Sequence, residues 1–426
     1  MIRRASPHLG RRHFLGGLFA CGPVFHRNAE GRVASTTVPV TELGADPTGT
    51  DDSSGAIQRA LDTGAPQVLI PEGKYRLDRS LIVSNSGQAV IGFGRRSVLY
   101  TTDPLTNGIE ISTGTVGARV ADFVLLGCSS QPEKHRHVGL LINATNSRLG
   151  APQQAEVVIF GVTLSGTTRE TGWSIGIHGH RSSGLTVEHC LVDSIIGQKS
   201  GSGYGILATG SEVTIRQCSI LANNLKNGRH GIYLGFGGNS LVESNYISGF
   251  IGSGICSNTS TQGSDSNIAI RSNFVMSCGY GTPYNDDSAI GLYMQGGISA
   301  AGSGCAIEGN TVVASGAHAV FANGHSRLSV ANNDIREFSL TTSKAHRAIS
   351  IWAGNDINIR ANRISNRAQD TISAIELRRV RSANVANNKL YDPTRPVRRS
   401  WIKGDDASEN VILDSNEVSS ELDILP

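Results

Sequence analysis

The residues best suited to proton transfer recur at one position of a short repeated strand pattern, of which Gly231-Ile232-Tyr233 is one copy. The position directly before the small residue of the pattern holds Tyr204, His230, His318 and Arg347 in four of the copies. A phenol or an imidazole can act as base or acid, and a guanidinium can stabilise negative charge that develops on a substrate. This column therefore predicts acid–base chemistry on one face of the molecule.

Neighbouring columns and one insertion extend the set of candidates. The insertion from Cys278 to Gly297 is long and contains Asp286 and Asp287. Two adjacent carboxylates can hold different protonation states or bind Ca²⁺, and no other cofactor or metal is indicated. The catalytic candidates are His230, Tyr233, Tyr204, Asp286, Asp287, His318 and Arg347. The substrate-binding candidates, which offer rings or polar groups to a ligand, are Arg229, His178, His180, Asn258, Tyr293, Asn323 and Trp352.

A second pattern indicates which elements hold these residues: an apolar residue, two residues, Asn, one residue and another apolar residue. The Asn of successive copies is Asn245, Asn273, Asn310, Asn333, Asn362, Asn388 and Asn416, and two earlier copies have Cys190 and Cys218 in that slot. The steps from Cys190 onward are 28, 27, 28, 37, 23, 29, 26 and 28 residues. A repeat of this length with one fixed polar position is typical of a solenoid.

Each copy alternates with a period of two and is rich in Val and Ile, which predicts a strand with its apolar side inward. Strands of one repeat would stack in parallel on those of the next, about 4.8 Å apart. The Asn side chains could then hydrogen-bond to their copies above and below, which would satisfy buried amides. We therefore predict an all-β fold, a single right-handed parallel β-helix of about ten rungs. A β-sandwich does not account for the fixed Asn position.

Composition agrees with this fold and excludes some classes of function. The 426 residues include 51 Gly and 5% aromatic residues, which suits tight turns around a thin core. The formal net charge of +3 is too small to indicate nucleic-acid binding, and no apolar run approaches the length of a membrane span. The Cys residues in the Asn slot are expected to be small buried thiols rather than disulfides.

The first 35 residues are predicted to be an export signal. Arg11-Arg12-His13-Phe14-Leu15 is similar to the twin-arginine type, with paired arginines followed by a mildly apolar stretch. Leu18-Phe19-Ala20-Cys21-Gly22 resembles a lipoprotein cleavage box, in which Cys21 would carry a lipid anchor. These features predict a bacterial protein that is periplasmic or secreted.

Residues 36–100 are predicted to form a cap and the first rungs, and residues 101–426 the rest of the β-helix. Asp51-Asp52-Ser53-Ser54 precede the amphipathic segment Ala56–Leu61 and are suited to capping a helix. Because a solenoid must cover its first rung, this helix is the expected lid.

The segment Leu43–Asp52, the helix and then Ile70–Tyr75 together resemble the opening of the pectate-lyase-like superfamily. That opening is shared by polygalacturonases, rhamnogalacturonases, epimerase-like proteins and phage tailspikes. The resemblance implies a parallel β-helix over nearly the whole chain and, for most members, an enzyme that acts on a polysaccharide, often an acidic one. It does not choose among the activities.

Two narrower resemblances imply different chemistry. Paired Asp residues, then His318 and Arg347, follow the order seen in polygalacturonases, but Ser253 stands where that family has a further Asp, and inverting hydrolysis needs a separated acid and base. Arg229-His230-Gly231 with Glu243 and Asn245 resembles a short motif of alginate and chondroitin lyases, which break sugar chains by β-elimination. C5-epimerases share the first half of that mechanism.

The hypotheses are therefore an exported lyase or C5-epimerase on a uronic-acid polysaccharide, a polygalacturonase-like hydrolase, and a non-catalytic carbohydrate-binding β-helix. An enzyme should bring an acid, a base and a positive charge together in adjacent rungs. A binding protein would instead present aromatic rings without such a convergent set.

Overall fold

A computed structural model describes residues 37–130, 137–143, 153–197, 203–222, 228–235, 238–260, 267–280, 288–295, 302–338, 340, 347–365, 373–391 and 401–419. The twin-arginine motif, Cys21, Asp286 and Asp287 lie outside the described residues. Of Asn258 and Tyr293 only the backbone is described. The export signal, the lipid anchor and the paired carboxylates therefore stay predictions.

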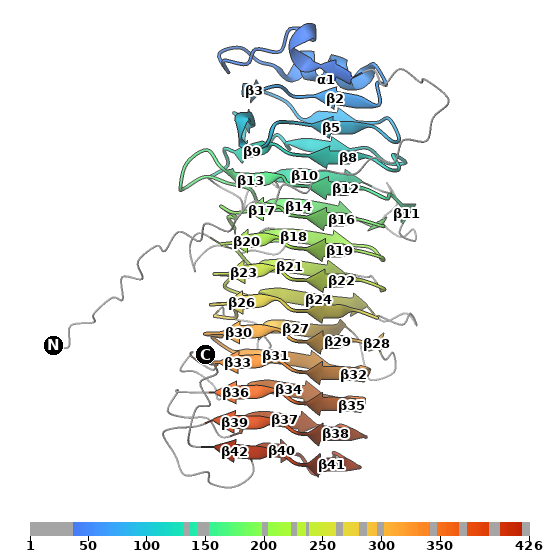
Figure 1. Cartoon of the computed structure of the whole chain (residues 1–426), viewed down its shortest axis with the longest axis vertical. Helices are drawn as coiled ribbons and strands as arrows, with labels where there is room; N and C mark the ends of the chain where they lie inside the picture. Colours follow the sequence, from blue (N-terminus) through green and yellow to red (C-terminus); the bar gives the residue numbers. More distant parts are fainter. Residues whose placement is uncertain are drawn as a thin grey trace, which may run out of the picture. The chain divides into compact units, whose positions relative to one another are not determined.

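Nearly all described elements are short strands in three parallel sheets, stacked rung upon rung (Figure 1). Sheet 1 contains β4 (Leu81–Val83), β7 (Ile109–Ile111), β10 (Val138–Asn143), β14 (Ile175–His180), β18 (Tyr204–Thr209), β21 (His230–Gly235), β24 (Ile255–Ser260), β27 (Ser288–Gln295), β31 (His318–Asn323), β34 (Ile349–Trp352), β37 (Ile375–Arg378) and β40 (Ile402–Gly404). Sheet 2 contains β1 (Thr37–Pro39), β2 (Gln67–Leu69), β5 (Ala89–Ile91), β8 (Arg119–Ala121), β12 (Val158–Phe160), β16 (Thr186–Glu188), β19 (Thr214–Arg216), β22 (Leu241–Glu243), β25 (Ala269–Arg271), β29 (Ala306–Glu308), β32 (His325–Ala331), β35 (Asn355–Arg360), β38 (Ala383–Ala386) and β41 (Val411–Asp414).

Sheet 3 contains β3 (Gly73–Leu77), β6 (Ser97–Thr101), β9 (Val124–Gly127), β13 (Thr163–Gly166), β17 (Leu191–Val192), β20 (Ser219–Leu221), β23 (Tyr246–Ser248), β26 (Phe274–Met276), β30 (Thr311–Val313), β33 (Asp334–Arg336), β36 (Arg363–Ser365), β39 (Lys389–Tyr391) and β42 (Glu417–Ser419). The short strand β28 (Gly302–Ser303) pairs with β32 of sheet 2, whereas β11 (Gln153–Gln154) and β15 (Ser182–Ser183) form a separate two-stranded parallel sheet. Along the chain each rung visits sheet 1, sheet 2 and sheet 3 in turn. The predicted parallel solenoid of about ten rungs is confirmed.

The core is the stack of inward apolar side chains that the period of two predicted. Val187, Ile215, Val242 and Ile270 pair in register on successive strands of sheet 2, and each is fully buried. Burying a Val or Ile side chain contributes roughly 1.5–3 kcal/mol. Since every rung repeats this contact, the sheets are held in one register, and that register fixes the outward residues too.

The turn from sheet 2 to sheet 3 explains the fixed Asn. The residue before each ladder Asn has a left-handed backbone, with φ between 48° and 64°: Ser244, Ser272, Gly309, Asn332, Ala361, Asn387 and Ser415. In each step the side-chain amide of one Asn donates to Oδ1 of the next at 2.9–3.0 Å, as from Asn273 to Asn310. The predicted ladder is confirmed. Cys190 and Cys218 are buried free thiols at its start, and the backbone N–H of Cys218 donates to Asn245.

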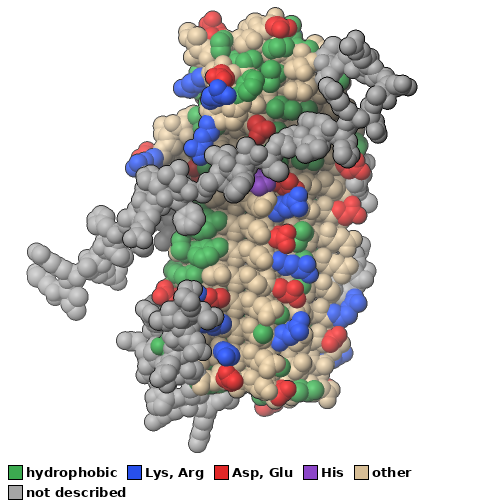
Figure 2. All heavy atoms as spheres, viewed as in Figure 1, with side chains coloured by type: hydrophobic (Ala, Val, Ile, Leu, Met, Phe, Trp, Pro, Cys, Tyr) green, Lys and Arg blue, Asp and Glu red, His purple; other side chains and the backbone are tan. Residues whose placement is uncertain are grey.

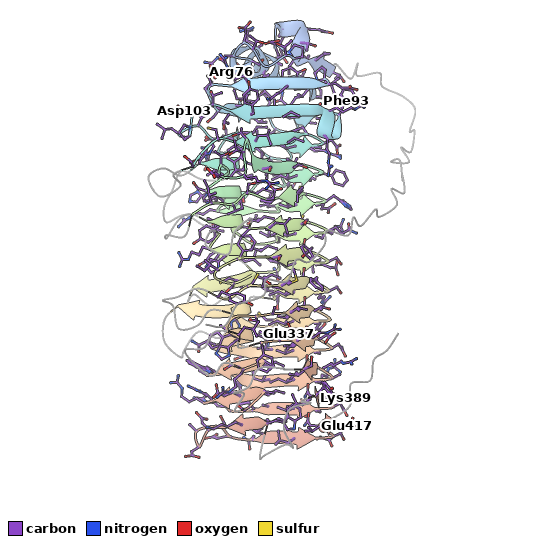
Figure 3. All side chains as sticks on the ribbon, turned by 90° about the vertical axis from the view of Figure 1, so that its left-hand side faces the viewer. Arg76, Phe93, Asp103, Glu337, Lys389 and Glu417 are labelled. Carbon is purple, nitrogen blue, oxygen red and sulfur yellow. The ribbon has the colours of Figure 1, made fainter. Side chains whose placement is uncertain are left out.

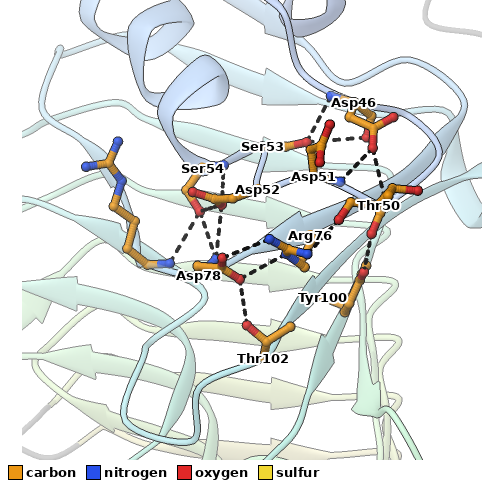
Figure 4. Close-up of polar contacts among 12 residues, drawn as sticks. Asp46, Thr50, Asp51, Asp52, Ser53, Ser54, Arg76, Asp78, Tyr100 and Thr102 are labelled. Atoms are coloured by element: carbon orange, nitrogen blue, oxygen red, sulfur yellow. Dashed lines mark hydrogen bonds and ion pairs between the residues drawn. The ribbon is translucent and has the colours of Figure 1, made fainter.

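The N-terminal segment forms the predicted helix, α1 (Ser54–Asp62), which buries Ile57 and Leu61. Two short 3₁₀ turns, η1 (Val40–Leu43) and η2 (Gly94–Arg96), accompany the first rungs. The predicted cap differs in detail, because Ser53 is the N-cap residue but its side chain makes no cap bond. Asp52 Oδ1 instead accepts the N–H of Ser54 at 2.9 Å (Figure 4).

Asp46 organises the loop that precedes α1 (Figure 4). Its carboxylate accepts the backbone N–H groups of Thr48, Thr50 and Asp51 at 2.8–2.9 Å. These donors favour the charged carboxylate and lower the pKa of Asp46 to about 2. Tyr100 ties the same loop to sheet 3 by donating to Gly49 O at 2.7 Å. The segment Leu43–Asp52, which resembles the opening of the superfamily, is therefore held in place beside the first rung by these hydrogen bonds.

The outward face of sheet 2 carries a column of alternating charge, visible as red and blue side chains in Figure 2. The column runs Glu188, Arg216, Glu243, Arg271 and Glu308 in consecutive rungs. Arg216 Nε lies 2.7 Å from Glu188 Oε1, and Arg271 Nε lies 3.7 Å from Glu308 Oε2. Alternation of sign makes this face a poor surface for a polymer of uniform charge. Sheet 3 has a similar pair, Lys389 and Glu417 at 3.5 Å (Figure 3).

Arg216→Glu should destabilise the fold by about 1 kcal/mol at low ionic strength, because it places three carboxylates in succession. At about 1 M salt, where the Debye length is roughly 3 Å, most of that loss should disappear. Thermal melts at both salt concentrations measure it, with Arg216→Gln as the control that removes attraction without adding repulsion. Equal losses at low and high salt would show that the column contributes packing rather than charge.

Candidate functional site

The outward face of sheet 1 holds the sequence-predicted residues in two groups rather than one. Tyr204 on β18 pairs directly with His230 on β21, and Leu207 pairs with Tyr233. His318 begins β31, which lies three strands beyond β21 through β24 and β27. Three strand spacings amount to about 14 Å, too far for His230 and His318 to act on one bond.

The first group, called the tyrosine–histidine cluster, consists of Tyr204, Arg229, His230 and Tyr233. The rings of Tyr204 and His230 lie 5.6 Å apart, those of Tyr204 and Tyr233 5.5 Å, and those of His230 and Tyr233 5.6 Å. Arg229 Nη1 donates to Tyr204 Oη at 3.4 Å. Two phenols, an imidazole and a guanidinium thus converge across two neighbouring rungs.

Two members of the cluster are buried, since Tyr204 and His230 are each 7% exposed, whereas Arg229 and Tyr233 are partly exposed. Burial, together with the smaller effect of the positive charge of Arg229, lowers the pKa of His230 to about 3. His230 is therefore neutral at any ordinary pH. Its Nδ1 accepts the backbone N–H of Ser253 at 3.1 Å.

This lowered pKa predicts acid sensitivity. Between the ordinary pKa of about 6.5 and the folded value of about 3, the unfolded chain binds a proton at His230 that the folded chain does not. The contribution of His230 should therefore lower the free energy of unfolding as the pH falls from 6.5 toward 3, by up to about 1.4 kcal/mol per pH unit. Chemical denaturation from pH 7 to pH 4 should show a shallower decline for His230→Gln. Parallel declines in both proteins would mean that other groups control acid unfolding.

The second group, called the arginine–glutamate cluster, consists of His318, Phe321, Arg347, Ser350, Trp352, Glu376 and Arg378. Glu376 is 4% exposed and lies 3.5 Å from Arg347 Nη2 and 3.0 Å from Arg378 Nη2. Ser350 Oγ donates to its other carboxylate oxygen at 3.2 Å. Burial lowers the pKa of Arg347 while the carboxylate of Glu376 opposes that effect.

Aromatic rings in this second group pack against the chain itself. Trp352 contacts Phe321 from the strand before it, at 5.2 Å between ring centroids. The guanidinium of Arg378, from the strand after it, lies 4.7 Å from the Trp352 ring centroid. Arg378 and Glu376 are not among the predicted site residues. From the sequence, Arg378 is expected to be a charged side chain exposed to solvent. Their place beside Trp352 follows from the register of β34 and β37.

The other predicted residues lie at different distances from the tyrosine–histidine cluster. His178 and His180 are on β14, one strand before Tyr204, with their rings 5.6 Å apart. Asn323 ends β31 and pairs with Trp352, in the second group.

Within the described residues, no group of three or more His, Cys, Asp or Glu side chains could hold a metal ion. The described part also contains no helix long and apolar enough to cross a membrane.

Comparison with known proteins identifies the fold. A family profile described as "Right handed beta helix region" matches residues 149–335. The chain folds as a right-handed parallel β-helix. A search of curated protein sequences finds no match.

Solved structures with the same fold have diverse roles. The chain is similar to the A-module of the mannuronan C-5 epimerase AlgE6 from Azotobacter vinelandii, with a TM-score of 0.70, 15% identity, and coverage of 90% of this chain and 100% of that one. It is also similar to the Agl-KA catalytic domain, with a TM-score of 0.62, 15% identity, and coverage of 91% and 70%. The Streptococcus pneumoniae surface protein and adhesin PfbA gives a TM-score of 0.52, 14% identity, and coverage of 90% and 97%. At these identities the comparisons show the fold alone.

Proposed function

We propose that the protein is an exported enzyme that removes the C5 proton of a uronic acid unit in a polysaccharide, as a lyase or a C5-epimerase. The observation that carries the proposal is the convergence of Tyr204, Arg229, His230 and Tyr233 on two adjacent strands of sheet 1. These are the base, acid and positive charge that such a reaction needs, on rigid elements.

The chemistry follows from the acidity of C5, which bears the carboxylate. Tyr204 would take the C5 proton, since the adjacent Arg229 guanidinium favours negative charge on its phenol oxygen. The electron pair released from the C–H bond moves toward the carboxylate, where hydrogen-bond donors stabilise it. In a lyase the pair then forms a C4–C5 double bond as the bond from C4 to the glycosidic oxygen breaks, and the departing oxygen takes the proton that Tyr204 has removed from C5. In an epimerase, a proton returns to C5 from the opposite face, and Tyr233, whose ring lies 5.5 Å from that of Tyr204, is the second phenol that the cluster offers as the acid.

Two further observations support an acidic polymer as substrate. The fold is that of a mannuronan C-5 epimerase module, although at 15% identity. The alternating charges of sheet 2 make that face a poor surface for a polyanion, whereas the tyrosine–histidine cluster of sheet 1 offers the guanidinium of Arg229. Export by the twin-arginine route, with Cys21 as a lipid anchor, belongs to the same proposal and would place the enzyme beside extracellular polysaccharide.

The proposal is tested by incubating the purified protein with a panel of uronic-acid polysaccharides, with and without Ca²⁺. Ultraviolet absorbance of the conjugated double bond and the count of reducing ends are followed in the same tubes. A rise in both identifies a lyase and its substrate. Reducing ends without absorbance would move the activity to hydrolysis, with Asp286, Asp287 and His318 as the residues to test.

A non-catalytic carbohydrate-binding protein is the second candidate function. The specific observation in its favour is the low exposure of Tyr204 and His230, which limits access to the cluster. A surface adhesin also shares the fold. Binding of an intact polysaccharide, measured by calorimetry, without cleavage or hydrogen exchange at C5 would establish this function and exclude the enzyme.

A further inference from the structure

We propose that Ser253 is a positioning residue whose backbone N–H fixes His230 in the tautomer that carries its proton on Nε2. His230 is then a permanent hydrogen-bond donor toward the outward face of sheet 1, and the base of the reaction is a tyrosine. This role in the reaction rests on the proposed function, whereas the tautomer itself does not.

The contact between Ser253 and His230 allows only one tautomer of the neutral imidazole. Ser253 N lies 3.1 Å from His230 Nδ1, and a backbone N–H can only donate. His230 Nδ1 must therefore present its lone pair. A neutral imidazole has a single N–H, so the proton is on Nε2. An imidazolium would place a second N–H at Nδ1 against that of Ser253, so the contact also disfavours the charged ring.

The fold holds the donor rigidly. Gly252 N donates to Arg229 O at 2.9 Å, and Ile251 N donates to Gly228 O at 3.0 Å, which tie this segment to the rung before it. A Cβ at Gly252 would collide with the carbonyl oxygen of Arg229 and lie 3.1 Å from His230 Cε1. Glycine at this position thus avoids that collision while the N–H of Ser253 contacts the ring.

The same arrangement recurs three strands further along sheet 1. The backbone N of Arg347 donates to His318 Nδ1 at 2.9 Å, and Arg347 occupies the column position that follows His318 by one rung, as Ser253 follows His230. A histidine in this column thus meets the N–H of the next rung because of the solenoid geometry. The recurrence makes the contact a property of the fold and not of one loop.

The consequence for the reaction is a division of roles. A histidine held with its proton on Nε2 cannot accept the C5 proton through Nε2, but it can donate to the substrate carboxylate and stabilise charge that develops there. The base must then come from Tyr204 or Tyr233, whose rings flank His230. The pH profile of kcat/KM should accordingly lack a limb at the ordinary histidine pKa of about 6.5.

The test uses Ser253→Pro, which removes the N–H, against Ser253→Ala, which keeps it. The alanine variant is a matched control, because Ser253 Oγ is buried and makes no hydrogen bond that its removal would break. Nitrogen-15 NMR of histidine-labelled protein reads the tautomer directly. Wild type and Ser253→Ala should show His230 with Nδ1 unprotonated and Nε2 protonated, and Ser253→Pro should show a mixture and roughly 10–100-fold lower kcat/KM.

If Ser253→Pro does not fold, the wild-type spectrum and two replacements of His230 keep the inference falsifiable. His230→Gln places an amide donor near the position of Nε2 and should retain more activity than His230→Asn, whose amide reaches only to Nδ1. A wild-type spectrum with the proton on Nδ1 overturns the inference even if the enzyme is active. If the spectrum is as expected but no uronic-acid polymer is turned over, the tautomer is confirmed and the proposed function is wrong.

Discussion

Tyr204→Phe should lower turnover of a uronic-acid polymer by about 10²–10⁴-fold, the range that one acid–base group contributes. The substitution deletes only the phenol oxygen that accepts the hydrogen bond from Arg229 at 3.4 Å, and it keeps the ring packed between β14 and β21. The melting temperature should therefore change little. Initial rates with saturating polymer, together with a thermal melt, measure both effects.

Tyr233→Phe is the informative companion variant. In a lyase that uses one tyrosine as base and acid, this change should cost less than Tyr204→Phe. In an epimerase that needs an acid on the opposite face of the sugar, both changes should be severe. Wild-type turnover in Tyr204→Phe would remove this residue from the mechanism.

The second large effect concerns stability: Asn310→Ala should destabilise the fold by about 3–6 kcal/mol. Asn310 Oδ1 accepts the backbone N–H and the side-chain amide of Asn273, and Asn310 Nδ2 donates to Ile270 O and to Asn333 Oδ1. Asn310 is fully buried, so no water replaces these partners. Each buried polar group left without a partner costs roughly 1–3 kcal/mol. Urea denaturation of both proteins measures the difference.

Asn416→Ala is the matched control for that prediction. Asn416 accepts the same two hydrogen bonds, from Asn388, but lies in the last described rung and is only partly buried. Because Asn416 is partly exposed, water can take the place of its side chain and bond to Asn388, so the loss should be under about 1.5 kcal/mol. Equal losses at both positions would mean that the ladder acts through local turn geometry rather than through buried hydrogen bonds.

The fold was predictable because its signals repeat. A single Asn in a turn says little, whereas seven in register predict both the strands and the ladder that the structure shows. The left-handed residue before each Asn could also have been inferred where it is Gly309, Asn332 or Asn387, since these types favour that conformation.

The site was predictable only in part. The register that pairs Tyr204 with His230 follows from aligning the strands, and the aromatic contacts follow from it. The columns predict that His230 and His318 share a face, whereas the two intervening strands β24 and β27 place them in separate groups. The hydrogen bond from Ser253 N to His230 Nδ1 has a backbone donor, so the place of the histidine in its column indicates it only once the backbone path of the next rung is known. The burial of Glu376 between two arginines likewise depends on side-chain conformations that spacing does not determine.

The most direct test of the account is hydrogen exchange at C5 of a uronic-acid polymer incubated with the enzyme in heavy water, followed by NMR of the sugar. Both a lyase that reverses its first step and an epimerase must break the C5–H bond at the tyrosine–histidine cluster. We predict enzyme-dependent deuterium at C5, or the unsaturated product that replaces it, with wild type and with Ser253→Ala but not with Tyr204→Phe. Retention of every C5 hydrogen across the whole panel of polymers, in protein shown to be folded, would contradict the proposed chemistry.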